Sequence, residues 1–372
     1  MKIPPFLLER YFAEYEFSAD FLLSPSDCEP FTLQEILEMA APEQRRLWDG
    51  LWLGYTESQG LPALREQIAK LYEDTFADGI LTLVPEEGIF IAMNVILNPG
   101  EHVVTTFPAY QSLYQIADSL GCRVSHWQPR RENQRCFFDV DDLERLIEND
   151  TRLLVVNFPH NPTGALPDKA SQQRILQLVE ERGIILFSDE MYRGLEYNPQ
   201  DRLPAACDWL ENAISLSGVS KTYSLPGLRI GWLATRSKQL FEQLASYKDY
   251  TTICSSAPSE ILAMIALQNS ETIIQRNLEI IQKNLTLLDG FFARHPDLFT
   301  WYRPRAGSIA FPEYHDDMDI DAFCANLIKE KGVMIAPASA FQHPGNFFRV
   351  GFGRRNMGEA LKELEAYLQQ QL

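Results

Sequence analysis

The sequence predicts an α/β fold, with a mostly parallel seven-stranded sheet in a large domain and a smaller α+β domain beside it. Two observations support this prediction. Between residues 81 and 234, seven short apolar runs alternate with helical patterns, which is typical of a parallel sheet with helices on both faces. Most of these runs are apolar throughout, as expected of strands that are buried on both faces.

The elements are expected in this order. Strands of the large sheet are expected at residues 81–84, 102–105, 122–126, 153–158, 184–188, 213–217 and 230–234. Helices are expected between them at 141–149 and 169–182, and after them at 256–282, 319–331 and 358–372, with short strands at 308–311 and 333–335. The large domain is expected to span residues 46–250, and the smaller domain to combine 1–45 with 251–372.

Composition and charge exclude several classes of function. The 372 residues include 33 Lys and Arg and 51 Asp and Glu, which gives a net charge of −18. An acidic surface repels nucleic-acid phosphates and anionic lipids, so neither a nucleic acid nor a membrane is an expected partner. The first residues lack the apolar core of a signal peptide. The six cysteines form no CxxC pair and the six histidines lack metal-ligand spacing, so we expect reduced thiols, a cytoplasmic location and no metal site.

One lysine stands in a turn of small residues. Residues 218–231 read GVSKTYSLPGLRIG, in which Arg229 follows Lys221 by eight residues. The small neighbours leave room for a bulky partner at the Lys221 amine. An amine in a site of low polarity beside other cations has a lowered pKa and becomes a nucleophile. An isolated lysine is more often a solvated surface residue, so both interpretations stay open at this point.

The same segment resembles the lysine signature of the fold-type I pyridoxal-phosphate enzymes, the class I/II aminotransferases, down to its Gly-Leu-Arg-Ile-Gly ending. The resemblance implies the type I pyridoxal-phosphate-dependent transferase fold and pyridoxal 5'-phosphate as the cofactor. It also implies that Lys221 forms a Schiff base with the cofactor and that Arg229 binds the cofactor phosphate, for which the planar guanidinium fork is suited.

Two further motifs match the family in order. The run NFPHNPTG at 157–164 closes an expected strand, and the resemblance implies that Asn161 contacts the phenolic oxygen of the cofactor and the substrate. The run SDEMY at 188–192 follows the next strand. It implies that Asp189 partners the pyridinium nitrogen, which keeps the cofactor an electron sink, and that Tyr192 is a second donor to the phenolic oxygen. The alternative for Asp189 is a helix N-cap.

Two tyrosines and an arginine complete the resemblance, which spans about residues 50 to 355. Tyr110, in Pro-Ala-Tyr, matches the aromatic that stacks on the pyridine ring, although an ordinary core aromatic fits equally well. Tyr55, in GYTESQG, matches the tyrosine that reaches the phosphate of the neighbouring subunit, which implies a homodimer. Arg349, in FFRVGFG, matches the clamp for the substrate α-carboxylate; a structural salt bridge is the alternative and suits Arg305, Arg354 or Arg355 better.

The expected phosphate site departs from the family pattern. Relatives place the phosphate on a helix N-terminus after a glycine and a small residue, whereas residues 83–88 read LVPEEG. Pro85 has no N–H to donate, so the amides of Glu86 and Glu87 are the expected donors, with both side chains turned outward.

A second departure concerns the lysine segment itself. Gly218 stands where many relatives have serine, and Ser217 or Ser220 is a possible substitute as hydroxyl donor. We therefore expect a phosphate site that depends strongly on Arg229, Tyr55 and Ser220.

The loop at residues 22–29 lies where relatives often cover the substrate. If Asp27 and Glu29 face the substrate, they disfavour acidic substrates and favour basic ones; the alternative is two solvated loop acids. No arginine for a second carboxylate is apparent, which disfavours a dicarboxylate substrate.

The expected function is transfer of an amino group from an L-amino acid to a 2-oxo acid by a ping-pong mechanism, with Lys221, Asp189 and Tyr110 as catalytic residues. In the family, the freed lysine amine is the general base at Cα. Cα deprotonation also begins elimination and cyclisation, so a carbon–sulfur lyase, an aminocyclopropane carboxylate synthase or a capreomycidine synthase remains an alternative. A non-catalytic cofactor-binding regulator is a remote one.

Overall fold

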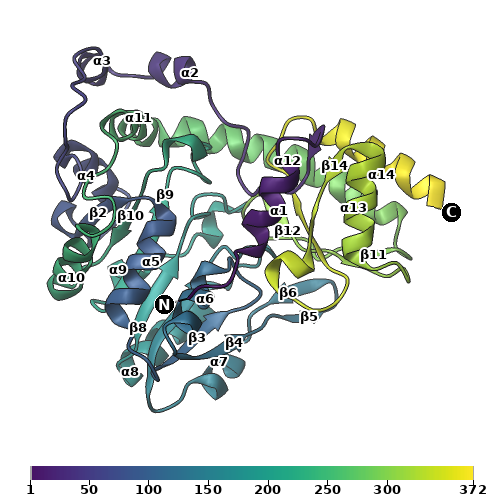
Figure 1. Ribbon diagram of the computed structural model, residues 1–372, viewed down its shortest axis with the longest axis horizontal. Helices are drawn as coiled ribbons and strands as arrows, with labels where there is room; N and C mark the ends of the chain where they lie inside the picture. The colour runs from purple at the N-terminus through teal and green to yellow at the C-terminus, as the bar shows by residue number, and fades with distance from the viewer. Residues whose placement is uncertain (1, 372) are drawn as a thin grey trace.

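The centre of the structure, a computed structural model that describes residues 2–371, is a seven-stranded sheet. Its strands lie in the order β2-β10-β9-β8-β7-β3-β4 (Figure 1). All neighbours are parallel except β10, which runs antiparallel to both β2 and β9. The bounds are β2 Ile80–Leu83, β3 His102–Thr106, β4 Arg123–Trp127, β7 Thr151–Asn157, β8 Ile185–Asp189, β9 Ala213–Gly218 and β10 Gly231–Ala234.

These are the seven strands that the apolar runs predict, each within two residues at either end. The predicted fold class is therefore confirmed. Successive residues of β7 face opposite sides: Leu153 and Val155 belong to one buried cluster, whereas Leu154 and Val156 belong to another. Burial on both faces explains why the runs are apolar throughout.

Helices cover both faces of this sheet. One face carries α5 (Pro85–Ile96), α6 (Ser112–Ser119) and α10 (Lys238–Lys248), and the other carries α7 (Val140–Leu146), α8 (Lys169–Arg182) and α9 (Ala206–Trp209). The bounds of α8 agree with the prediction because both ends carry a signal. The Asp168 side chain accepts a hydrogen bond from the Ser171 amide, and Gly183 ends the helix in the left-handed conformation.

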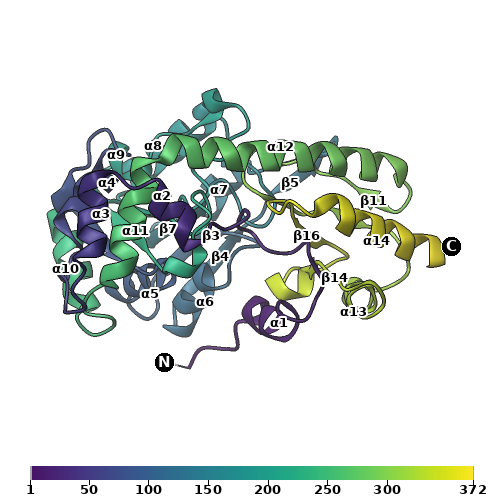
Figure 2. The same cartoon turned by 90° about the horizontal axis from the view of Figure 1, so that it is seen from above.

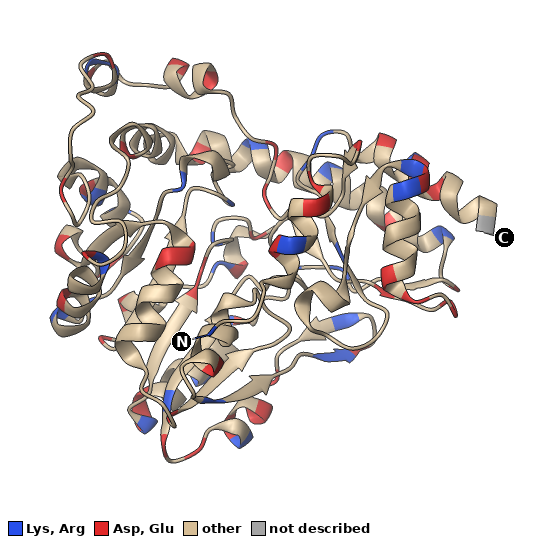
Figure 3. Ribbon diagram, in the orientation of Figure 1, with Lys and Arg blue, Asp and Glu red and all other residues tan. Residues whose placement is uncertain are grey.

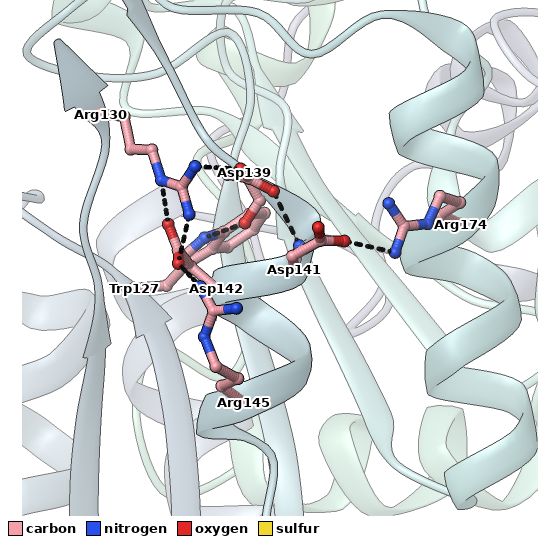
Figure 4. A network of polar contacts seen from close by, with 7 residues as sticks. All are labelled: Trp127, Arg130, Asp139, Asp141, Asp142, Arg145 and Arg174. Carbon is pink, nitrogen blue, oxygen red and sulfur yellow. Dashed lines mark hydrogen bonds and ion pairs between the residues drawn. The ribbon is translucent and has the colours of Figure 1, made fainter.

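An ion-pair network joins the start of helix α7 to strand β5 and helix α8 (Figure 4). Arg130, on β5 (Arg130–Glu132), contacts both carboxylate oxygens of Asp142 at 2.7 and 2.8 Å and pairs with Asp139 at 2.6 Å. From α8, Arg174 reaches Asp141 at 2.8 Å. Exposed pairs of this kind contribute little singly, but together they hold the start of α7 against both elements.

The C-terminal third is built from helices and small sheets. The long helix α12 (Ser270–Arg294) runs between the two halves of the molecule (Figure 2). Beside it lie α13 (Ile320–Lys331), α14 (Met357–Gln371) and a three-stranded sheet of β12 (Ile309–Ala310), β16 (Phe348–Gly351) and β15 (Ala336–Pro337). Other short pairs are β11 (Phe299–Thr300) with β13 (Glu313–Tyr314), and the hairpin of β5 with β6 (Arg135–Phe137).

The single helix predicted at residues 256–282 is wrong. It is two helices, α11 (Ala257–Gln268) and α12, and the second extends twelve residues further, to Arg294. They separate at Asn269, whose side-chain amide donates to the carbonyl oxygens of Met39 and Ile265. A polar side chain that bonds local backbone competes with a continuous helix, and the contact with Met39 is long-range and invisible in the periodicity.

The N-terminal segment contacts both halves. Helix α1 (Leu7–Tyr15) packs beside the 3-10 turn η4 (Ala338–Phe341), and β1 (Phe21–Leu22) pairs in parallel with β14 (Val333–Met334). In contrast, α2 (Leu33–Glu38), α3 (Pro42–Asp49) and α4 (Pro62–Ala69) pack on α11. The division of the chain at residues 45 and 250 stays a prediction.

Acidic residues are spread over both halves of the molecule and are interspersed with basic ones (Figure 3). Within residues 2–371, none of the helices is both long enough and apolar enough to cross a membrane.

Candidate active site

A cavity of about 370 Å³ opens at the carboxyl ends of the parallel strands β7 and β8, the edge at which open α/β sheets bind ligands. Its walls come from α1, the loop at 24–30, the start of α5, the strand ends and β16. Nine of the eleven predicted site residues line it: Lys221, Asp189, Asn161, Tyr192, Tyr110, Arg229, Ser220, Glu86 and Arg349.

Lys221 lies in the turn that follows β9, and its Nζ donates a hydrogen bond to Ser26 Oγ at 2.8 Å. Burial lowers the pKa of this amine; Asp27 opposes that shift, and Arg349 and Arg229 add to it. A lysine with a lowered pKa has a larger neutral fraction at a given pH, so more of the amine is available to act as a nucleophile or as a base.

Asp189 is the last residue of β8 and is buried. Its Oδ1 accepts a hydrogen bond from the Met191 amide at 3.1 Å. Burial is the main reason that its pKa rises to about 7, and the charge of Glu190 adds to the shift. A buried carboxyl of this kind favours a cationic partner, which would return it to its charged form.

Asn157, which the sequence analysis did not single out, joins two of the predicted residues. It ends β7 beside Asp189, in register on β8. Its side-chain amide donates to the Asp189 carbonyl oxygen at 3.1 Å, and its Oδ1 accepts from the Asn161 amide at 2.7 Å. Its place at the end of a buried strand, four residues before Asn161, is the signal that could have identified it.

Arg349 is a buried cation, with 2% of its surface exposed. Its Nη1 donates to Asn161 Oδ1 at 3.1 Å, and its Nε and Nη2 donate to the Ser24 carbonyl oxygen at 3.1 and 2.8 Å. The rings of Phe12 and Phe341 lie 5.6 and 5.1 Å from the guanidinium carbon. No acidic side chain among residues 2–371 forms an ion pair with it, so this buried charge favours an anionic ligand.

The two predicted tyrosines of the cavity differ in their partners. Tyr192 is 2% exposed, and its buried hydroxyl has no hydrogen-bond partner among residues 2–371, which is costly unless a ligand supplies one. Tyr110 donates from its hydroxyl to Glu9 Oε1 at 2.9 Å, and its ring lies 4.7 Å from that of Phe6.

Glu86 and Glu87 lie on different faces of the first turn of α5. Glu87 turns away from the cavity, where it accepts hydrogen bonds from the Val84 amide and from Thr252. Glu86 corrects the expectation that both side chains turn outward, because it lines the cavity and accepts from Ser112 Oγ at 3.1 Å. Burial raises its pKa to about 7. Ser112 holds it on the same helix face as Pro85 and Ile89, which also line the cavity.

The two departures around the expected phosphate site are in contact. Gly218 on β9 pairs in register with Gly231 on β10, and the ring of Pro85 lies over this pair. A Cβ added at Gly218 would lie 3.0 Å from Gly231 Cα and 3.1 Å from Pro85 Cγ. A side chain at residue 218 and a proline ring at residue 85 therefore compete for one space.

Tyr55 lies outside this cavity. Its side chain is 85% exposed, and Trp52 and Leu53 beside it are almost equally exposed. Its expected contact with a neighbouring subunit stays a prediction.

Helix α1 and the following loop contribute residues that the sequence analysis placed elsewhere or left undecided. Glu9, Phe12 and Glu16 line the cavity, and their i, i+3, i+7 spacing was the available signal. Asp27 is not a solvated loop acid: it is buried, lines the cavity and pairs with Arg354 at 3.0 Å.

Comparisons with known proteins agree with this geometry. A family model described as aminotransferase class I and II matches residues 23–364. The chain belongs to the class I and II aminotransferase family. This explains why Lys221, Asp189, Asn161 and Arg349, from four separate segments, meet in one cavity.

Three relatives of this aminotransferase-family chain are informative. It is 30% identical to a capreomycidine synthase from Streptomyces vinaceus over 353 residues, which cover 94% of this chain and 90% of the relative. A crystal structure of a PLP-dependent aminotransferase from Streptococcus suis 89-1591 superimposes with a TM-score of 0.92 at 31% identity, covering 100% and 99% of the two chains. A PLP-dependent cyclase, OrfR, gives a TM-score of 0.91 at 26% identity over 100% and 99%.

Proposed function

We propose that this chain is an aminotransferase that uses pyridoxal 5'-phosphate to move an amino group from an L-amino acid to a 2-oxo acid. The observation that carries the proposal is the cavity itself. It combines an amine of lowered pKa at Lys221, a buried carboxyl at Asp189 and an unpaired buried guanidinium at Arg349.

The residues present fit the cofactor. The orphaned Tyr192 hydroxyl suits its phenolic oxygen, the Asp189 carboxyl suits its ring nitrogen, and Arg229 suits its phosphate. When bound, the cofactor supplies an electron sink for the negative charge that forms at the substrate Cα.

The chain's own residues then have distinct roles. Arg349 binds the substrate α-carboxylate, with its guanidinium held by Asn161 and the Ser24 carbonyl. The Lys221 amine is placed to take the proton from the substrate Cα, which breaks the Cα–H bond, and to hold that proton on Nζ for return within the same site. Asp189 would keep the ring nitrogen protonated, because a carboxylate beside that nitrogen stabilises its positive charge.

We further propose a homodimer in which Tyr55 of each chain reaches the phosphate end of the other active site. The exposed aromatic and aliphatic side chains of Trp52, Leu53 and Tyr55 form a contiguous segment that a second copy would cover. The amides of Glu86 and Glu87 and the hydroxyl of Ser220 complete this phosphate end.

A second candidate function is cyclisation of an amino acid. The 30% identity to a capreomycidine synthase and the fold of the cyclase OrfR favour it. Both reactions need the same removal of the Cα proton, so the residues that contact the cofactor do not separate them; a lyase differs from both by releasing ammonia.

The test follows the visible absorbance of the cofactor-loaded protein while single amino acids from a panel are added. An aminotransferase loses its yellow band with an amino donor, forms one equivalent of 2-oxo acid and regains the band with a second 2-oxo acid. Consumption of an amino acid without a 2-oxo acid or ammonia would favour the cyclase. No yellow band after addition of cofactor would contradict the proposal.

A further inference from the structure

Helix α1 places two carboxylates over the active-site cavity. Glu9 lies in its first turn and Glu16 is its C-cap residue, and both line the cavity, as does Phe12 between them. The opposite face points outward: Glu14 is exposed. One face of the helix is therefore built into the site.

The position of α1 is fixed from both halves of the molecule. Gln111, at the start of α6, accepts from the Leu7 amide at 2.8 Å and donates to the Pro5 carbonyl oxygen at 3.0 Å. From the other side of the helix, the Tyr11 hydroxyl donates to the Ile335 carbonyl oxygen at 2.6 Å. These contacts hold the acidic face toward the cavity.

Arg229 is assigned by the proposed function to the cofactor phosphate, and the other cations of the cavity are engaged elsewhere. Arg354 pairs with Asp27 at 3.0 Å and also donates to the Cys28 carbonyl oxygen at 3.3 Å. Lys221 donates to Ser26, and Arg349 is held by Ser24 and Asn161. The proposed function assigns Lys221 to the cofactor and Arg349 to the substrate α-carboxylate.

The acids of α1, in contrast, have no cation. Among residues 2–371, neither Glu9 nor Glu16 forms an ion pair; Glu9 accepts one hydrogen bond, from Tyr110. Burial raises the pKa of Glu16; the nearby charges of Asp27 and Glu9 add to that shift, and those of Arg354 and Lys221 oppose it without forming an ion pair with Glu16. A second observation points to the substrate in the same cavity: Arg349 is 2% exposed and forms no ion pair with an acidic side chain among residues 2–371.

We propose that the amino-acid substrate carries a cationic side chain, an amine or a guanidinium, whose N–H groups donate to Glu9 and Glu16. The proposal rests on the proposed function, because Arg349 must hold the α-carboxylate for the side chain to point toward α1. Phe12, between the two acids, supplies an apolar surface for the methylene groups of a long basic side chain.

The arrangement disfavours an acidic substrate side chain. Arg354 is the remaining cation at this wall, and binding a substrate carboxylate there would require it to leave Asp27, which is buried. Leaving a buried carboxylate unpaired is costly, whereas a cationic side chain breaks no existing contact.

The test compares L-lysine with L-norleucine, which has the same carbon chain without the amine, and includes L-arginine and L-glutamate. Binding is measured as stabilisation of the cofactor-loaded protein against thermal unfolding, and turnover as loss of the yellow band. Wild-type protein is expected to bind lysine or arginine at least about tenfold more tightly than norleucine, as one charge-assisted hydrogen bond predicts.

Matched variants identify the residues. Glu9→Gln and Glu16→Gln should each lower the preference for lysine over norleucine about tenfold. At residue 9, glutamine can still accept the hydrogen bond from Tyr110. Glu14→Gln removes the same charge from the outward face of the same helix and should leave the preference intact.

The inference would be overturned if norleucine bound with the same affinity as lysine, or if glutamate bound more tightly than both. Binding and turnover also separate the two proposals. Loss of the yellow band with neutral amino acids alone would support the aminotransferase and refute the cationic substrate. Preferential binding of lysine or arginine without 2-oxo acid formation would support the cationic substrate and refute the aminotransferase.

Discussion

The ring of Pro85 lies against Gly218, with its Cγ 3.1 Å from the point that a Cβ on that glycine would occupy. Pro85 opens α5 and Gly218 ends β9, so the contact joins the start of one helix to the strand that leads to Lys221. Pro85 also leaves the first helical position without an N–H. The two departures at the expected phosphate site are thus one packing arrangement, in which the proline ring takes the space of a side chain at residue 218 and removes a backbone donor at residue 85.

Gly218→Ser is expected to destabilise the fold by about 1–3 kcal/mol, the usual cost of forcing atoms into a filled space. Denaturant unfolding measures this, and Gly227→Ser is the control because an added Cβ there meets nothing within 4 Å. In the double variant Pro85→Ser/Gly218→Ser the loss should be smaller than the sum of the two single losses, because the contact with Pro85 is relieved whereas Gly231 Cα and Ile230 O still lie 3.0 Å from the added Cβ. Strictly additive losses would refute the competition for space.

Glu86 predicts a pH-dependent stability. Its pKa rises from 4.5 to about 7 in the folded chain, mainly through burial, so its contribution to stability is present below about pH 4.5 and is lost as the pH rises toward 7. Glu86→Gln stays neutral and should therefore gain stability relative to wild type between about pH 5 and pH 8, by up to roughly 3 kcal/mol.

Unfolding of the cofactor-free protein at both pH values tests this prediction. Glu87→Gln controls for net charge. It removes the same charge from the next residue, whose side chain faces Thr252 and not the cavity. A Glu86→Gln variant whose advantage does not grow with pH would contradict the assignment.

Arg349→Lys should raise the KM for amino acids by ten- to a hundredfold, because lysine cannot keep the planar fork toward a carboxylate while bonding Asn161 and the Ser24 carbonyl. The yellow band of the bound cofactor should persist. Steady-state kinetics measure the effect. Arg305→Lys is the control, because Arg305 pairs with Asp201 outside the cavity. An unchanged KM would exclude Arg349 as the carboxylate clamp.

Tyr55→Phe should weaken cofactor binding about tenfold by removing one hydrogen bond to a charged group. A mixing experiment tests whether that bond crosses between subunits. When Tyr55→Phe and Lys221→Ala proteins exchange subunits, each mixed dimer has one site with both native residues. At a cofactor concentration that leaves Tyr55→Phe mostly unloaded, activity should therefore rise above that of either parent. Activity that stays at the average of the parents would show that Tyr55 serves its own chain.

The sheet and most of the site could be predicted because their signals are local. Burial on both faces makes strands such as β7 apolar throughout, and chemistry at Lys221 or Asp189 sits at strand ends within short motifs. The bounds of α8 were predictable for the same reason, since Asp168 and Gly183 mark its ends.

What the sequence did not predict depends on long-range contacts. The break between α11 and α12 at Asn269 involves Met39, and the inward position of Glu86 involves Ser112. The acidic face of α1 enters the site because distant residues, Gln111 and Ile335, hold that helix. Periodicity shows which residues share a face but not what that face meets.

The most direct measurement compares Lys221→Ala with the wild type in the half-reaction with an amino acid. The account predicts that the variant retains cofactor affinity through its other contacts but reacts about a hundred- to ten-thousandfold more slowly, as loss of a general base implies. Lys238→Ala, at an exposed surface position, should react like wild type. An undiminished rate in Lys221→Ala would contradict the central claim that this amine carries the chemistry.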